Sequence, residues 1–200
     1  MDLSMVNSHQ EWADLYQKLV YWELELEGIE DPGMFEILES QKMEANTQFC
    51  KFIDKNYPDW FDAKTDAPTM SHTLFRDKVV PHINNSKSTL FIVIDNLRYD
   101  QWKAIEPFIS NHYKKASEEM YFGILPSATQ YARNAIFSGM MPADMEKLHP
   151  KLWLNDTDEG GKNLYEKEFL EAQLKSLGLK LNWSYTKISS LKQGKRFVDN

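Results

Sequence analysis

The chain has little cysteine: Cys50 is the single one among 200 residues. An intramolecular disulfide is therefore excluded, and a lone thiol fits a reducing compartment, so we expect a cytoplasmic protein. Because Phe49, Phe52 and Ile53 lie close by in the sequence, Cys50 itself is expected to be a small buried hydrophobic residue.

Long apolar runs are also missing. None approaches the roughly 20 residues that a membrane-spanning helix needs. The first ten residues, MDLSMVNSHQ, lack the basic and apolar regions of a signal peptide. We therefore expect no membrane span.

Basic residues are fewer than acidic ones. The chain has 23 Lys and Arg and 30 Asp and Glu, which gives a net charge of −7. This balance argues against broad, non-specific binding to nucleic-acid backbones. A nucleotide or oligonucleotide substrate stays compatible with it, because a bound metal can supply positive charge locally. The hydrophobic fraction of 42% excludes wholesale disorder.

The first quarter of the sequence has the signals of two helices. A capping box, S-x-x-E, begins at Ser8, and apolar residues recur at three- and four-residue steps from Trp12 to Leu26. Gly28 is a suitable stop, after which Asp31-Pro32 provides an N-cap and a first-turn proline.

The second helix must end before Pro58, and its short connection to the first predicts an antiparallel helical hairpin. We interpret its apolar stripes as the core of the hairpin. The alternative is that part of a stripe stays exposed and binds a partner helix. A short third helix is expected over residues 71–80, and His72 and His82 lack metal-ligand spacing.

The most informative stretch is Ser88–Asp100. Residues 89–94, TLFIVI, form a continuous apolar run that predicts a strand buried on both faces, as in a parallel sheet of an α/β protein. Asp95 ends this run. Ligands of open α/β sheets bind at the carboxyl ends of strands, so Asp95 is a candidate metal or substrate ligand. Alternatively, Asp95 only caps the following helix, which we expect over about ten residues.

A second strand is expected at residues 120–125 before Pro126, and a helix should start close to Thr129 and end at Gly139. The N-terminus of a helix suits a phosphate because its N–H groups are unpaired and its dipole end is positive. Thr129 is therefore either an N-cap or a nucleophile.

The last part of the chain predicts a loop, a helix and a strand. Residues 155–161 lack the spacing of a calcium loop and are interpreted as a solvated linker. A helix is expected over 162–177 with Gly178 as its stop, followed by a half-exposed strand over 179–185. The basic residues 187–196 either form a solvated surface or guide an anionic substrate.

Two motifs together resemble a known family. The segments I-D-N-L-R-Y-D and P-S-A-T-Q-Y-A-R-N-A-I-F-S-G-M-M-P are similar to the alkaline phosphatase superfamily, in which an Asp after the first strand binds a metal and a Ser or Thr opening a later helix is the nucleophile. Gly139 and Pro142 match the Gly-x-x-Pro that follows that helix. Within the superfamily the chain most resembles the PglZ domain, and more closely the PorX-type response regulators of Bacteroidetes.

The resemblance implies a helical connector, which residues 9–57 match, followed by the N-terminal part of an alkaline-phosphatase-like α/β domain. Because the helical period changes to an apolar strand near Ser86, we expect the connector domain over residues 1–86 and the α/β domain over 87–200. Asp95 corresponds to the metal ligand, and Thr129 to the nucleophile, which also contacts metal. Ser127 is its rival. The implied activity is zinc-dependent hydrolysis of phosphodiesters in nucleotides or oligonucleotides, with two zinc ions, in signalling linked to type IX secretion and gliding.

The match to the superfamily is incomplete. An Asp-His pair, typical of the remaining metal ligands, does not occur, and His149 is the sole histidine after Thr129. We therefore expect a piece of a longer protein that is inactive alone. One alternative is a non-catalytic signalling module that forms a homodimer through helices within 9–57. A nucleotide-binding or receiver-like domain is the weakest alternative, because the usual phosphate-binding glycine motifs are missing.

Overall fold

The computed structural model describes residues 3–29, 31–62, 66–83 and 87–199. It divides the chain into a first unit, Met1–Met70 with Ile92–Gly123, and a second unit, Ser71–Phe91 with Ile124–Asn200. The predicted boundary between residues 86 and 87 touches Ser86, which lies outside the described residues, so this boundary stays a prediction.

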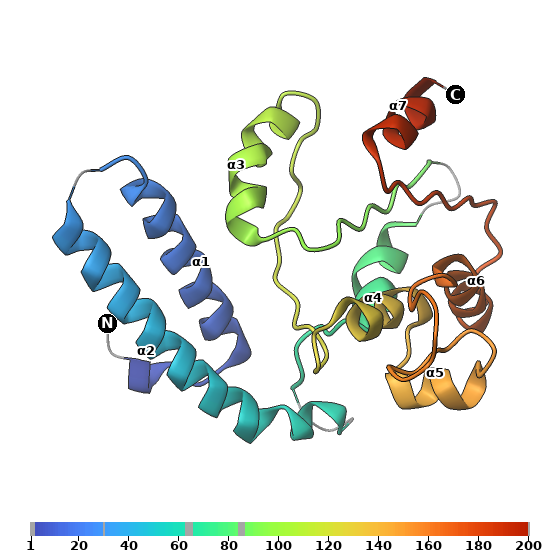
Figure 1. Cartoon of the computed structure of the whole chain (residues 1–200), viewed down its shortest axis with the longest axis horizontal. Coiled ribbons are helices and arrows are strands. Elements are labelled where there is room, and N and C mark those ends of the chain that lie inside the picture. The colour runs from blue at the N-terminus through green and yellow to red at the C-terminus, as the bar shows by residue number, and fades with distance from the viewer. Residues whose placement is uncertain (1–2, 30, 63–65, 84–86, 200) are drawn as a thin grey trace. The chain divides into compact units, whose positions relative to one another are not determined.

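Helices dominate both units (Figure 1). The first unit contains η1 (Leu3–Met5), α1 (His9–Leu26), α2 (Pro32–Asn56), η2 (Pro58–Phe61) and α3 (Tyr99–Ser110). The second contains η3 (Phe75–Val79), η4 (Val80–His82), α4 (Thr129–Ser138), α5 (Pro142–Leu148), α6 (Glu166–Ser176) and α7 (Leu191–Asp199).

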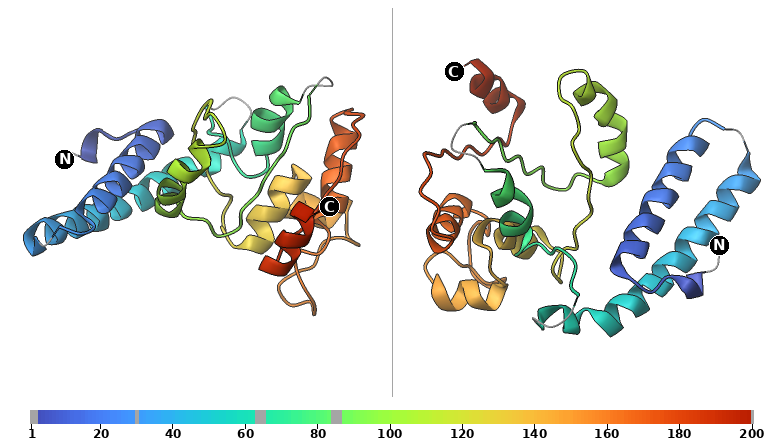
Figure 2. Two further views of the ribbon diagram at one scale, coloured as in Figure 1. Left: turned by 90° about the horizontal axis from the view of Figure 1, so that it is seen from above. Right: turned by 180° about the vertical axis from the view of Figure 1, so that it is seen from behind.

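The predicted helical hairpin is confirmed: α1 and α2 run side by side in Figure 1 and in the right-hand view of Figure 2. The Ser8 hydroxyl accepts from the N–H of Glu11, whose carboxylate accepts from the N–H of Ser8 at 2.9 Å, which is the predicted capping box. Gly28 adopts a left-handed φ of 92° just beyond the end of α1. Asp31 caps α2 by accepting from two backbone N–H groups.

An aromatic core holds the first unit together. The ring centroids of Trp12 and Phe49 lie 5.3 Å apart, and those of Trp60 and Phe122 lie 5.1 Å apart. Such pairs add to the stability gained from apolar burial. The hairpin stripes thus form core, as predicted, although Cys50 is exposed and its predicted burial is wrong.

The core of the second unit lies between α4, α5 and α6 (Figure 1). Its largest fully buried side chain is Phe169 of α6, which is joined by Met145 of α5. Phe137 of α4 contacts the rings of Phe91 and Tyr185 at centroid distances of 6.4 Å and 6.0 Å. Two of the predicted strand segments therefore pack against α4 as extended chain.

The predicted α/β fold with a parallel sheet is wrong for the described residues. The β-type pairing that has both partners among the described residues is an isolated parallel bridge between Met70 and Phe122. Leu90, Ile92 and Ile94 are 73%, 66% and 55% exposed, instead of buried on both faces. An apolar, β-branched run favours an extended backbone, but a sheet also needs a neighbouring strand to satisfy its N–H and C=O groups.

Three helical details differ from the prediction. Residues 71–80 form no α-helix, because a π-helical turn, η3, runs directly into the 3₁₀ turn η4. α6 begins at Glu166 rather than 162, since the carbonyls of Lys162 and Asn163 accept hydrogen bonds from the side chains of Asn134 and Lys187. The basic end of the chain forms a helix, α7, that the sequence reasoning missed.

None of the helices in the described ranges combines the length and the apolar character needed to cross a membrane.

Candidate active site

Asp95 lies in the first unit, exposed, in a turn that follows the extended segment. It does not occupy the N-cap of the next helix, because α3 begins at Tyr99 with Arg98 at the cap. The next residue, Asn96, has a left-handed φ of 59°. Burial raises the pKa of the Tyr121 hydroxyl, and the negative charge of Asp95 raises it further. The carboxylate of Asp95 therefore interacts electrostatically with Tyr121 of the same unit.

Thr129 lies in the second unit as the first residue of α4, so the helix start is confirmed. Ala128 occupies the N-cap position and provides no side-chain cap, which means that the N-cap interpretation of Thr129 is wrong. Gly139 ends the helix with a φ of 68°, as predicted. The α4 N-terminus thus presents backbone N–H groups and the positive end of the helix dipole beside a hydroxyl residue.

Hydrogen bonds to the loop between α5 and α6 hold the first turn of α4 in place. Asn163 donates to the carbonyl oxygen of Thr129 at 3.2 Å, and Gln130 donates to the carbonyl oxygen of Leu154 at 3.1 Å. The Tyr131 hydroxyl donates to Asp156 at 2.6 Å, and this hydrogen bond is the main cause that raises the pKa of Tyr131.

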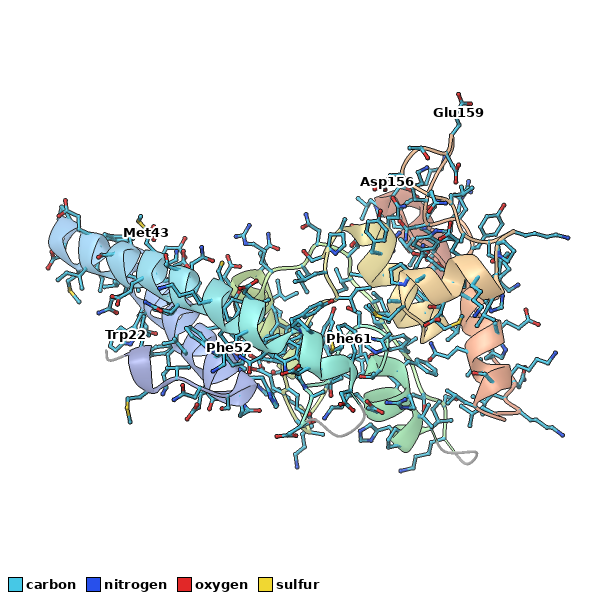
Figure 3. The ribbon with its side chains drawn as sticks, turned by 90° about the horizontal axis from the view of Figure 1, so that it is seen from below. Trp22, Met43, Phe52, Phe61, Asp156 and Glu159 are labelled. Carbon is cyan, nitrogen blue, oxygen red and sulfur yellow. The ribbon has the colours of Figure 1, made fainter. Side chains whose placement is uncertain are left out.

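The loop over residues 155–161 is exposed, and Figure 3 shows Asp156 and Glu159 on it. Its interpretation as a mere solvated linker is incomplete, because Asp156 is a partner of α4.

A buried carboxylate, Glu166, gathers cations beside α4. Glu166 is only 3% exposed, and it forms ion pairs with Arg133 of α4 and, at 2.9 Å, with Lys187. Tyr185 donates its hydroxyl to the same carboxylate at 2.6 Å. Burial, followed by this hydrogen bond, raises the pKa of Tyr185. A buried charge is stable only when paired and hydrogen-bonded, which explains why these partners converge.

The Glu166 cluster, which consists of Glu166, Arg133, Tyr185 and Lys187, is linked by hydrogen bonds to the residues around Thr129. Lys187 donates to the carbonyl oxygen of Asn163 at 2.7 Å, and Asn163 in turn holds Thr129. Arg133 lies four residues after Thr129 and therefore on the same side of the helix. Arg133 and Lys187 carry one positive charge more than Glu166, but Asp156, which accepts from Tyr131 in the first turn of α4, offsets it. The feature that suits an anionic group is therefore the set of backbone N–H groups at the start of α4.

The described part of the chain does not provide the ligands of a complete metal site. There, no group of three or more His, Cys, Asp or Glu side chains lies close enough to hold an ion. Asp95 and Thr129 belong to different units. A zinc site needs three or four protein ligands, so these two residues do not make one by themselves.

The sequence reasoning missed Arg133, Asn163 and Glu166. The spacing of Arg133, four residues from Thr129 on a predicted helix, was a usable signal. Asn163 and Glu166 gave no signal, because both fell inside the helix predicted over 162–177. Asn163 acts through hydrogen bonds to Asn134 and Thr129, which lie 29 and 34 residues earlier in the sequence. Glu166 acts through its ion pair with Arg133 of α4.

Comparison with known proteins agrees with the motifs. Residues 1–61 match the PorX response regulator linker domain, and residues 74–197 match the BREX system PglZ alkaline phosphatase-like domain. A search of curated proteins finds no significant match. The second match covers more than half of the chain, and its superfamily commonly uses metals. The chain therefore belongs to the PglZ alkaline phosphatase-like family and carries a PorX-type response regulator linker domain at its N-terminal end.

Proposed function

We propose that the phosphatase-like domain hydrolyses phosphodiesters with Thr129 as the nucleophile. The observation that supports this most directly is the position of Thr129 as the first residue of α4, with Asn163 bound to its carbonyl oxygen. Residues 1–86 form the connector and 87–200 belong to the catalytic domain, as the sequence predicts.

The proposed reaction is a substitution at phosphorus. The Thr129 oxygen forms a bond to phosphorus, while the ester alkoxide leaves and takes up the proton that the hydroxyl loses. Water then cleaves the phosphothreonine ester. The N–H groups at the start of α4 stabilise the negative phosphoryl oxygens.

Asp95 and Thr129 are proposed as zinc ligands. Because neither this pair nor the described residues provide three ligands for one ion, further donors must complete the site. The family resemblance supports zinc as the metal, a nucleotide or oligonucleotide as the substrate and a link to type IX secretion. The single cysteine supports the cytoplasm as the compartment.

The test is hydrolysis of bis-p-nitrophenyl phosphate with added zinc by the natural protein that contains this chain. Thr129→Ala should lower kcat at least a hundredfold, whereas Thr129→Ser keeps a hydroxyl and should retain measurable turnover. Ser127→Ala is the matched control and should behave like the unmodified protein. Unchanged activity in Thr129→Ala would remove Thr129 from the reaction.

A second candidate function is dimerisation through α1 and α2. Trp22 of α1 and Met43 of α2 are both more than half exposed, and Figure 3 labels both on the hairpin. Large exposed apolar side chains are typical of interaction surfaces. Light scattering should give a dimer mass that Trp22→Glu reduces to that of a monomer. A monomeric unmodified chain would contradict dimerisation.

A further inference from the structure

A lysine ammonium closes the loop between α5 and α6, the loop on which Figure 3 labels Asp156 and Glu159. The Nζ atom of Lys162 donates to the carbonyl oxygens of Asn155 and Asp158. Residues 149–165, all of which the structure describes, contain no helix or strand. Carbonyl groups in such a segment depend on side chains or water for their donors, and Lys162 supplies two of these hydrogen bonds.

Asn155 anchors one end of this loop. Its side-chain amide donates to Glu146 of α5 at 2.9 Å, and its side-chain oxygen accepts from the Trp153 indole at 2.9 Å. Because Lys162 bonds the carbonyls of both Asn155 and Asp158, it ties the far end of the loop to this anchored end. An ammonium suits the position, since it is a compact charge with three donors and no acceptor.

The closed loop holds the first turn of α4 from both sides of the Lys162 contacts. Before Lys162 in the sequence, Asp156 accepts from the Tyr131 hydroxyl at 2.6 Å. Directly after it, Asn163 donates to the carbonyl oxygen of Thr129 at 3.2 Å. The two contacts with α4 therefore come from the segments that the Lys162 ammonium brings together.

We propose that Lys162 is a positioning residue of the candidate active site. Its ammonium holds the loop closed, and the closed loop sets the position of the first turn of α4, where Thr129 lies. This inference rests on the function proposed for Thr129. A small displacement of a reacting group slows the reaction without weakening the contacts that bind the substrate, so loss of the ammonium should lower kcat more than it changes KM.

The kinetic test uses the natural protein that contains this chain, with bis-p-nitrophenyl phosphate and zinc. Lys162→Met keeps an unbranched side chain but removes the ammonium, and should lower kcat at least tenfold while KM changes less than twofold. The matched control is Lys151→Met, which removes an exposed lysine that precedes the loop and should leave both parameters unchanged.

The position of α4 is tested separately by amide hydrogen exchange of the whole chain at pH 7, measured by NMR. The N–H of Ala132 bonds the carbonyl of Ala128 in the first turn of α4, as the N–H of Trp12 bonds that of Ser8 in α1. Lys162→Met should speed exchange at Ala132 at least threefold and leave Trp12 unchanged. Equal acceleration at both amides would show a general loss of stability and would overturn the proposal, as would unchanged exchange at Ala132.

The role of the charge is tested by chemical rescue. Lys162→Cys is combined with Cys50→Ser, which leaves one thiol in the chain. Alkylation with 2-bromoethylamine restores an ammonium at the length of lysine and should restore slow exchange at Ala132. Alkylation with 1-bromopropane adds a neutral chain of the same length and should not. Rescue by both reagents would show that side-chain bulk suffices, which overturns the role of the ammonium.

Two kinetic results separate this proposal from the function on which it rests. If Thr129→Ala keeps full activity, the proposed function fails, and the positioning role of Lys162 in the reaction fails with it. If Thr129→Ala is inactive but Lys162→Met keeps the kcat of the unmodified protein, the function stands and the positioning role of Lys162 is overturned.

Discussion

The two units are stabilised in different ways. The first has a core of aromatic and aliphatic side chains centred on Trp12, with its charged groups near the surface. The second unit contains every buried polar residue of the described chain, namely Ser71, Asn134, Ser138, Glu166 and Gln173. Apolar packing tolerates many partners, but a buried polar group needs a specific one. The specific geometry around α4 therefore comes from polar contacts.

Three of these buried polar residues hold α4 in place. Asn134 donates to the carbonyl oxygen of Lys162, Gln173 donates to those of Ile136 and Phe137, and Glu166 pairs with Arg133. Every one of these contacts fixes α4, the helix that begins at Thr129. The same contacts that satisfy buried groups thus hold the candidate nucleophile.

The largest contrast between the units is expected for one substitution made in both. Glu166→Gln removes the charge that Arg133 and Lys187 pair with, and should lower the free energy of unfolding by about 3 kcal/mol. Glu118→Gln, the matched control in the first unit, should cost at most about 1 kcal/mol. Urea titration measures both, and equal losses would contradict the difference between the units.

The end of α4 provides the second contrast. Gly139 and Gly178 share a φ of 68°, but a Cβ on Gly139 would lie 2.9 Å from the buried Gln173 amide, while Gly178 has open space. Gly139→Ala should cost about 2 kcal/mol or more, and Gly178→Ala about 1 kcal/mol, the cost of a left-handed alanine. The thermal midpoints of the two variants report the order, and a larger loss for Gly178→Ala would reverse the argument.

The first unit depends more on local signals. Ser8→Ala removes the capping box of α1 and should lower stability by about 1 kcal/mol. Ser8→Thr keeps the hydroxyl and is the control. Far-ultraviolet circular dichroism during urea unfolding measures the loss, and an unchanged midpoint in Ser8→Ala would mean that packing alone fixes the start of α1.

The smallest effect is expected from the surface ion network and depends on pH. Partial burial of Glu118 opposes ionisation, but hydrogen bonds from Tyr99, Lys115, Trp102 and Lys103 outweigh it and lower the pKa of Glu118 to about 2. A lowered carboxyl pKa stabilises the fold above its ordinary value near 4.5, and this stabilisation is lost as the pH falls from 4.5 towards 2.

The sign of this pH effect can be checked with the same variant. Glu118→Gln should differ from the unmodified chain in its free energy of unfolding at pH 6, and this difference should be smaller at pH 3. Added salt should also reduce the difference. Urea titrations at both pH values measure it. A difference that grows as the pH falls would contradict the network.

The difference between the units also explains how far the sequence could predict the fold. Caps, stops and apolar spacing act over a few residues, so the hairpin was predicted from Ser8, Gly28 and Asp31 almost to the residue. The sheet was predicted wrongly, because an apolar run specifies extended backbone but not the strand that pairs with it. The run at 89–94 is extended yet unpaired.

For the candidate site, the sequence placed Thr129 at a helix start because that position also depends on local signals. The roles of Asn163 and Glu166 could not be predicted, because their partners lie in α4 and the sequence around them predicted only a helix. The pairing of Asp95 with Thr129 stays a prediction.

The most direct test of the central claim is to locate the covalent intermediate. The natural protein, incubated with bis-p-nitrophenyl phosphate and zinc and quenched in acid, should carry a p-nitrophenyl phosphate adduct, which peptide mass spectrometry should place on Thr129 and which Thr129→Ala should lack. An adduct on Ser127, or turnover that continues in Thr129→Ala, would contradict the account.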